Sequence, residues 1–283
     1  MKHFTLGYIC NERGVGKDEE IFTELAKQKN IELVMFNTAK EIDEKELEEK
    51  AQRCDLIFNN CGDEFVYEII KTFEAIGKKV IEPSKIYYFT EDKWISYILF
   101  SQNKIPTPET SLLSTNLNIA KKDLKLFNHW PVVLKRVWGC RGEYVEKADN
   151  MEQAEAIIKR FWEKGDEKLP IIAQEFIKSS SYRVTVIGDE IVQTAIKDSK
   201  GWKCTGVYEK KVEKFNIDPE LEKIIKKVMR TVKIKVCGID FLKKEDKWLV
   251  LEVNSVPAYD FFEDERKMLI GKILDYLKTQ VRK

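Results

Sequence analysis

The first part of the chain alternates short apolar runs with amphipathic segments. The apolar runs, which predict β-strands, lie at residues 4–10, 31–36, 55–60 and 78–83. Between them, apolar side chains recur at helical spacing over residues 18–28, 41–53 and 64–77. Strands separated by helix-length segments are typical of a parallel sheet with helices on its faces. The pattern therefore predicts three strand–helix units followed by a fourth strand.

The pattern changes near Pro83 and predicts a small α+β domain. Helices are expected at residues 91–103, with Thr90 as N-cap, and at 150–165, with Asp149 or Asn150 as N-cap. Strands are expected at residues 130–137, 144–147 and 170–177. The segments 104–110 and 138–143 contain Pro or Gly and are interpreted as turns.

The last part of the chain predicts two hairpins and two helices. One hairpin covers residues 182–197 and turns at Gly188 and Asp189; the other covers 236–254 and turns at Glu245 and Asp246. Helices are expected at 218–232 and 263–280. Together the patterns predict a mixed α/β and α+β chain with domains at residues 1–88, 89–174 and 175–283.

Three oxygen-bearing side chains are expected to converge in the second hairpin. Glu252 and Asn254 end an otherwise apolar strand and point to the same side, because strand residues two apart share a face. Asp240 lies among apolar residues of the preceding strand, where an unpaired carboxylate is costly. Antiparallel pairing brings the two strands' side chains together, and Mg²⁺ prefers such oxygen ligands. The set predicts a metal site, although Glu252 and Asn254 taken singly would also suit a strand end and a turn.

Two lysines and a glycine-containing turn predict a phosphate-binding site near this metal. Lys135 ends an apolar strand, and Lys93 lies near the start of the helix expected at 91–103. Taken alone, Lys93 is better explained as part of a solvated helix face, and Lys135 is equally compatible with a strand-end side chain that extends its charge to solvent. The turn Gly139-Cys140-Arg141-Gly142 follows Lys135 closely, and its glycines would let backbone N–H groups approach a phosphate. The strand Gln174-Glu175-Phe176-Ile177 could present backbone groups and apolar walls to a flat heterocycle.

A second glycine-containing segment resembles a phosphate-binding loop but lacks its pattern. Residues 14–17 read Gly-Val-Gly-Lys, as at the end of a P-loop. The P-loop requires Gly at position 11 and Ser or Thr at position 18, whereas this chain has Asn11 and Asp18. We interpret the segment as a polar turn before a helix capped by Asp18.

Charge and cysteine content exclude several classes of protein. The 283 residues include 49 Lys and Arg and 48 Asp and Glu, a net charge of +1, which argues against nucleic-acid or polybasic membrane binding. There is neither a bilayer-length apolar run nor a signal-peptide pattern, so a cytoplasmic protein is expected. Six cysteines without a CxxC pair, and only two histidines, argue against zinc or a disulfide framework and favour reduced, partly buried thiols.

These motifs, in this order, resemble the ATP-grasp superfamily. The segments that carry the resemblance are Lys93, Lys135, the GCRG loop, QEFI, Arg183, Asp240 and EVN at residues 252–254. Within the superfamily, residues 78–262 are most similar to the branch containing the ribosomal-protein-S6 glutamate ligase and the lysine-biosynthesis carrier-protein ligases. The chain departs from that branch at Ser181, Lys197 and Thr205, where the branch has Asp, Arg and Asn.

The resemblance implies a three-domain ATP-grasp architecture with a Rossmann-like N-terminal domain. It also implies that ATP lies between the central and C-terminal domains. Lys93 and Lys135 would contact phosphates under the loop Gly139, Cys140, Arg141 and Gly142. Gln174, Glu175, Phe176 and Ile177 would frame the adenine, and Asp240, Glu252 and Asn254 would bind Mg²⁺ or Mn²⁺. Arg183 and Lys197 would face the reacting acylphosphate.

The implied activity is carboxylate–amine ligation with release of ADP and phosphate. The substrates would be an amino acid, a small molecule, or a peptide or carrier protein, and the oligomeric state, including a homo-oligomer, stays open. Two alternatives use the same scaffold: a small-molecule kinase with a hydroxyl acceptor, or an ATP-binding protein without turnover. The near-neutral charge does not call for a polyphosphorylated substrate, and a protein without turnover would not require all five metal and lysine residues.

Overall fold

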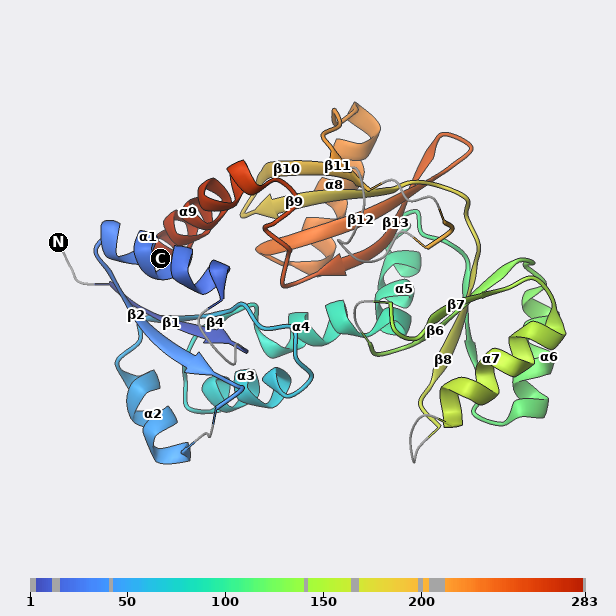
Figure 1. The fold of residues 1–283 in the computed structure, drawn as a ribbon, viewed down its shortest axis with the longest axis horizontal. Helices are drawn as coiled ribbons and strands as arrows, with labels where there is room; N and C mark the ends of the chain where they lie inside the picture. Colours follow the sequence, from blue (N-terminus) through green and yellow to red (C-terminus); the bar gives the residue numbers. More distant parts are fainter. Residues whose placement is uncertain are drawn as a thin grey trace.

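Three β-sheets organise the chain (Figure 1). A computed structural model describes residues 4–11, 16–40, 43–139, 142–163, 168–197, 201–203 and 212–281. The sheet formed by β1–β4 and the sheet formed by β5–β8 lie at opposite ends of the molecule, and the sheet formed by β9–β13 lies between them (Figure 1). The observed mixture of parallel and antiparallel sheets confirms the predicted fold class. The proposed domain boundaries at residues 88 and 174 stay predictions.

The first sheet is parallel, with the order β2-β1-β3-β4, and confirms the expected strand–helix units. Its strands are β1 (Phe4–Cys10), β2 (Ile31–Asn37), β3 (Leu56–Asn59) and β4 (Val80–Ile81), and its helices are α1 (Lys17–Gln28), α2 (Glu44–Gln52) and α3 (Val66–Ala75). Every residue of β1 is buried, because helices cover both faces of the sheet. The expected cap Asp18 is wrong: α1 begins at Lys17 after Gly16, and Asp18 lies in the first turn.

Two helices, rather than the single one expected, connect the first sheet to the second. They are α4 (Ser84–Glu91) and α5 (Lys93–Gln102). Asp92 separates them in an extended conformation, and its carboxylate accepts a hydrogen bond from the backbone N–H of Ile95 at 2.8 Å. An aspartate in this position is a strong N-cap, so the expected cap Thr90 is wrong. Thr90 instead donates its hydroxyl to the backbone of Tyr87.

The second sheet is antiparallel, with the order β5-β8-β6-β7. Its strands are β5 (Thr110–Leu113), β6 (Val132–Arg136), β7 (Val145–Ala148) and β8 (Ile171–Glu175), and its helices are α6 (Leu117–Phe127) and α7 (Met151–Glu163). The helices bury a shared apolar core against the sheet. The strands at β6, β7 and β8 and the helix at α7 confirm the predictions, whereas β5 and α6 were not predicted. The Asn150 side chain accepts from the backbone of Gln153, as expected of a cap.

The third sheet is also antiparallel, with the order β11-β10-β9-β12-β13. Its strands are β9 (Ser181–Ile187), β10 (Glu190–Lys197), β11 (Val212–Glu213), β12 (Val236–Lys244) and β13 (Lys247–Asn254). Helix α8 (Pro219–Val232) lies between β11 and β12 in the sequence, and α9 (Glu263–Thr279) follows β13. Both predicted hairpin turns are confirmed. The apolar side of α8 packs on one face of this sheet and leaves the opposite face for polar residues.

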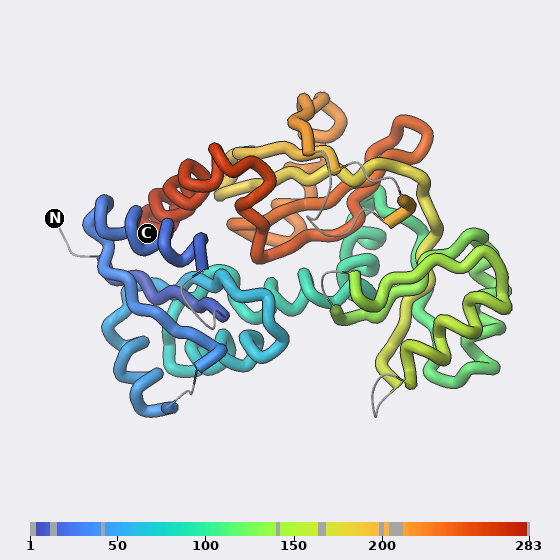
Figure 2. Tube along the Cα trace, in the orientation of Figure 1, coloured from blue at the N-terminus to red at the C-terminus, as the bar shows by residue number. Residues whose placement is uncertain are grey.

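The final helix α9 returns to the first sheet and lies beside α1 (Figures 1 and 2). Leu269, Ile270 and Ile273 are fully buried there in one core with Phe22 and β1. The two ends of the chain thus form one layer over the first sheet. The described cysteines Cys10, Cys54, Cys61 and Cys237 are free and buried, as expected, while Cys140 and Cys204 lie outside the described residues.

Glu82 joins the first sheet to the third and predicts a pH-dependent stability. Its side chain is 2% exposed and accepts the backbone N–H groups of Lys235 and Val236, both at 2.8 Å. Burial raises the pKa of Glu82 from 4.5 to about 7, although the two N–H donors oppose the shift. A raised pKa in the folded state means that this group's stabilising contribution is present below pH 4.5 and is lost as the pH rises through about 7.

We expect Glu82→Gln to remove this loss. Between about pH 5 and about pH 8, the fall in the free energy of unfolding should be smaller than in the wild type by about 1–3 kcal/mol. Denaturant unfolding at the two pH values measures the difference. Glu48→Gln, at an exposed position of α2, is the matched control and should keep the wild-type pH dependence. An unchanged pH dependence in Glu82→Gln would contradict the assignment.

Candidate active site

The hairpin of β12 and β13 brings the three expected oxygen ligands together. Asp240 pairs with Glu252, and Asn254 pairs with Gly238. Asn254 Nδ2 donates to Glu252 Oε1 at 3.5 Å, and Asp240 is only 4% exposed. A bulge shifts the register immediately after Asp240, a device that often re-aims side chains beside active sites. The predicted convergence is present; the role of the three side chains as metal ligands stays a prediction.

Two positively charged side chains, those of Arg183 and Lys197, lie next to the Asp240 carboxylate. Arg183, on the neighbouring strand β9, donates from Nε to Oδ1 at 2.5 Å and from Nη2 to Oδ2 at 2.7 Å. Lys197 Nζ lies 3.6 Å from Oδ1. Burial alone would raise the pKa of Asp240, but the charges of Arg183 and Lys197 outweigh it and lower the pKa to about 2. The carboxylate is therefore ionised in a site where an isolated charge would be costly.

Lys93 and Lys135 approach the same place from the second sheet and its connecting helix. Lys135 Nζ donates to Gln174 Oε1 at 2.7 Å, across the pairing of β6 with β8. Lys93 Nζ donates to the backbone oxygen of Gly139 at 2.7 Å. Burial lowers the pKa of Lys135 to about 8, although Glu252 and Asp240 oppose the shift. Lys135 thus carries a poorly hydrated charge that an anion would stabilise.

Residues 174–177, which were expected to frame a heterocycle, lie at the end of β8 and directly after it. Gln174 also donates to Thr110 Oγ1 at 3.0 Å, and Glu175 accepts from Lys244 at 2.5 Å. These two side chains are therefore held by neighbours. Phe176 lies 6.2 Å, between ring centres, from Trp202, which was not predicted. Lys203, also not predicted, donates to the backbone oxygen of Gly142 at 2.5 Å.

All expected site residues in the described part of the chain line one cleft of about 610 Å³. These residues are Lys93, Lys135, Gly139, Gly142, Gln174, Glu175, Phe176, Ile177, Arg183, Lys197, Asp240, Glu252 and Asn254. Cys140 and Arg141, the other two members of the expected glycine loop, lie outside the described residues. A cleft of this size can enclose a small-molecule ligand.

Residues next to the first sheet, in α1 and in the loop between β13 and α9 also line the cleft. We call them the N-terminal wall: Asn11, Asp18, Glu19, Asn60, Cys61, Gly62 and residues 256–261. Asn11 follows β1 and Asn60 follows β3, at the carboxyl ends of two neighbouring strands. From these two strands the chain continues to opposite sides of the sheet, to β2 and to β4. In parallel sheets, a ligand crevice usually lies at the carboxyl ends of two such neighbouring strands.

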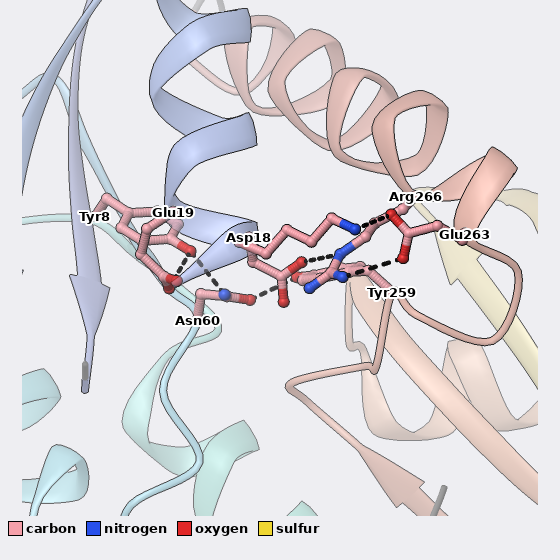
Figure 3. Close-up of polar contacts among 8 residues, drawn as sticks. Tyr8, Asp18, Glu19, Asn60, Tyr259, Glu263 and Arg266 are labelled. Atoms are coloured by element: carbon pink, nitrogen blue, oxygen red, sulfur yellow. Dashed lines mark hydrogen bonds and ion pairs between the residues drawn. The ribbon is translucent and has the colours of Figure 1, made fainter. Parts of the chain in front are cut away.

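Hydrogen bonds hold the N-terminal wall together (Figure 3). Asn60 accepts from Tyr259 Oη at 2.5 Å and donates to Tyr8 Oη at 2.7 Å. Tyr8 in turn donates to Glu19 at 3.2 Å. Beside them, Arg266 of α9 donates to Asp18 at 2.6 Å (Figure 3). Lys17, the lysine of the rejected P-loop-like segment, forms an ion pair with Glu263 at 2.5 Å.

The oxygen set on the hairpin suits Mg²⁺ or Mn²⁺. Asp240 is ionised, and a carboxylate has about four lone-pair sites, so it can bind a metal while it accepts from Arg183. Two carboxylates and an amide oxygen, completed by phosphates, are ligands that Mg²⁺ accepts. Among the described residues, no group of three His, Cys, Asp or Glu side chains is arranged to hold a metal.

Comparison with known proteins identifies the family. Residues 90–277 match the RimK-like ATP-grasp domain. The chain belongs to the RimK-like ATP-grasp family. The coenzyme γ-F420-2:α-L-glutamate ligase of Methanocaldococcus jannaschii is 31% identical over 74% of this chain and 76% of its own length. A probable α-L-glutamate ligase of Legionella pneumophila is 27% identical over 76% of this chain and 72% of its own length. This RimK-like chain is an ATP-dependent carboxylate–amine ligase.

Solved structures share the fold of this RimK-like protein. A RimK domain ATP-grasp protein from Sphaerobacter thermophilus superposes with a TM-score of 0.73 at 16% identity, over 95% of this chain and 98% of that one. The D-alanine–D-alanine ligase of Bacillus anthracis complexed with ATP gives a TM-score of 0.74 at 17% identity, over 98% of this chain and 97% of that one. At such low identity, these likenesses establish the ATP-grasp fold.

The lowered pKa of Lys135 predicts how nucleotide affinity depends on pH. As the pH rises through about 8, Lys135 loses its proton and with it the attraction to phosphate. Calorimetric affinity for MgATP should therefore fall above that pH. Lys135→Arg should flatten the profile, because an arginine stays charged over the whole range. Lys125→Arg, on the exposed side of α6, is the control and should keep the wild-type profile; a Lys135→Arg profile that matches the wild type would argue against Lys135 as the titrating group.

Proposed function

We propose that the cleft binds MgATP between the second and third sheets and joins a carboxylate to an amine through an acylphosphate. The observation that carries the proposal is the convergence of Lys93 and Lys135 with Asp240, Glu252 and Asn254 around one cleft. Cations and oxygen ligands in this combination suit a metal-bound polyphosphate. In this arrangement, ATP is the phosphoryl donor and Mg²⁺ or Mn²⁺ is the metal.

The nucleotide would be held by groups on both sheets. Lys93 and Lys135 would bind phosphate oxygens beside Gly139 and Gly142, and Lys203 donates a hydrogen bond to the backbone oxygen of Gly142. Residues 174–177 and the ring of Trp202 enclose the adenine. Asp240, Glu252 and Asn254 would hold the metal, which would supply charge neutralisation and orientation of the phosphates. The domains at 1–88, 89–174 and 175–283 are proposed to follow this division of roles.

The proposed reaction has two steps. A substrate carboxylate oxygen attacks the γ-phosphorus of ATP, the bond to the β-phosphate oxygen breaks, and ADP leaves. The amine nitrogen then attacks the acyl carbon, phosphate leaves, and the nitrogen loses a proton. Arg183 and Lys197 face this point and would stabilise the negative charge that develops on the acylphosphate. Enclosure of the site limits hydrolysis of that intermediate.

The substrates are proposed by chemical class. The relatives named as glutamate ligases support an amino acid as one substrate, joined to a small molecule, a peptide or a carrier protein. The N-terminal wall is the proposed acceptor-binding surface, because it adjoins the metal-binding hairpin in the same cleft.

We infer a cytoplasmic location. Within the described residues, no helix has the length and apolar character needed to cross a membrane.

Loss of one metal ligand tests the metal assignment. Glu252→Gln removes a charged oxygen ligand, and turnover should fall by about a hundredfold or more at fixed Mg²⁺, while the melting temperature stays near that of the wild type. ADP release measured by a coupled assay gives the rate. Glu245→Gln, in the exposed turn of the same hairpin, is the matched control. Wild-type turnover in Glu252→Gln would exclude this residue as a ligand.

A mass-spectrometric screen tests the reaction itself. Protein is incubated with MgATP and pools of amino acids, dicarboxylates, amines and peptides, and both nucleotide and organic products are identified. We expect ADP together with a product whose mass equals acid plus amine less water. ADP with a phosphorylated product would instead support a kinase, and wild-type protein without any ADP release would count against a catalytic site.

A further inference from the structure

A contact between two distant segments lies next to groups that are proposed to hold MgATP. The hydroxyl oxygens of Thr90 and Ser255 are 3.1 Å apart, although 165 positions separate the two residues in the sequence. Ser255 directly follows Asn254, the last residue of β13. Thr90 is the penultimate residue of α4, and Lys93 begins α5 shortly after it. One hydrogen bond therefore connects the end of the metal-binding hairpin to the joint between α4 and α5.

The hydroxyl of Thr90 serves two partners at once. It donates its single proton to the backbone oxygen of Tyr87 at 2.8 Å. Its oxygen retains lone pairs that can accept a proton from the Ser255 hydroxyl. Ser255 is only 2% exposed, so the loss of this partner would leave a buried hydroxyl poorly satisfied. The pair is therefore a constraint on the structure rather than an incidental surface contact.

The Thr90 side of the contact is fixed to the first sheet. Tyr87 is fully buried in the core of that sheet, and its hydroxyl donates to the backbone oxygen of Asp63 at 3.0 Å. Between Thr90 and Lys93, the Asp92 carboxylate caps the first turn of α5. Thr90 and Lys93 thus have a definite position relative to each other and to the first sheet.

The Ser255 side of the contact leads directly into the proposed metal site. The contact between Asn254 Nδ2 and Glu252 Oε1 is long, at 3.5 Å, and holds the amide weakly. The direction of the amide therefore depends strongly on the backbone that carries it. Further along this segment, Tyr259 donates to Asn60 at 2.5 Å (Figure 3). Of these two anchors, Ser255 is the one adjacent to Asn254.

We propose that Thr90 is a positioning residue, which acts through Ser255 to fix the metal ligand Asn254 relative to the phosphate-binding Lys93. The inference rests on the proposed function and adds to it a residue outside the metal ligands. Mg²⁺ tolerates little departure from octahedral geometry. A hairpin end that shifted relative to Lys93 would therefore bind the metal of a metal–nucleotide complex less tightly.

Calorimetric titrations of ADP on the full chain, one series with Mg²⁺ and one with EDTA, test the proposal. The ratio of the two dissociation constants measures how much the metal adds to nucleotide binding. Thr90→Val removes the hydroxyl and keeps a β-branched side chain. It should weaken MgADP binding by about tenfold and change the affinity for metal-free ADP by less than about twofold. Thr90→Ser retains the hydroxyl and should bind MgADP within about twofold of the wild type.

A second threonine provides the matched control. The hydroxyl of Thr72 donates to the backbone oxygen of Glu68 at 2.8 Å, as that of Thr90 does to Tyr87, but Thr72 lies on the exposed side of α3. Thr72→Val therefore removes the same kind of helical hydrogen bond away from the cleft. It should bind MgADP as the wild type does.

A double-mutant cycle shows whether the two hydroxyls act as one contact. Ser255→Ala removes the other partner and should weaken MgADP binding by about as much as Thr90→Val does. The double variant should then be weaker than Thr90→Val alone by no more than about twofold. Two independent structural roles would instead give effects that add in free energy.

Three outcomes would overturn the proposal. They are wild-type MgADP affinity in Thr90→Val, equal weakening of MgADP and metal-free ADP in that variant, and additive effects of Thr90→Val and Ser255→Ala. Failure of the proposed function has a different signature. Wild-type protein would then bind ADP equally well with Mg²⁺ and with EDTA, which would remove the metal site and this inference together.

Discussion

The buried ion pair between Arg183 and Asp240 is the constraint on which the site depends. Asp240 lies inside a sheet, at 4% exposure, where a carboxylate without a partner would be strongly destabilising. Arg183 occupies the paired position on β9 and meets both carboxylate oxygens, and Lys197 approaches from the next strand. Gly238 is required beside them, because a Cβ at that position would come within 2.2 Å of the guanidinium. One charged residue thus determines the residue types on three neighbouring strands.

The remainder of the cleft extends this pattern of compensated charge. Lys135 is buried against Gln174, and its proton is held weakly until an anion approaches. The carboxylates of the N-terminal wall, from α1 and from the loop before α9, line the same cleft. Because α8 covers one side of the third sheet with apolar side chains, its other side can be polar without loss of a core. The architecture therefore separates the task of folding from the task of binding across the thickness of a single sheet.

Local patterns predicted the parts of this structure that depend on local chemistry. The strand–helix alternation, both hairpin turns and the pairing of Asp240 with Glu252 follow from periodicity and turn residues. Apart from Glu91, the helix α4 lies outside the helix expected at 91–103, and the cap of α5 was placed at Thr90, because the capping role of Asp92 depends on a backbone conformation that the sequence pattern does not show. The hydrogen bond between Asn60 and Tyr259 could not be predicted in this way, because 199 residues separate two groups that meet only when the end of the chain packs on the first sheet.

The return of α9 to the first sheet has a consequence for biosynthesis. One face of β1 shares its core with Leu269, Ile270 and Ile273, which lie near the far end of the sequence. A ribosome makes the first sheet long before these residues, so during most of translation α1 is the part of this layer that can cover the face, through Phe22, Leu25 and Ala26. Domains ordinarily fold as units while the chain emerges. Here the core over β1 is completed only when α9 packs beside α1, so the first sheet and the final helix fold as one unit.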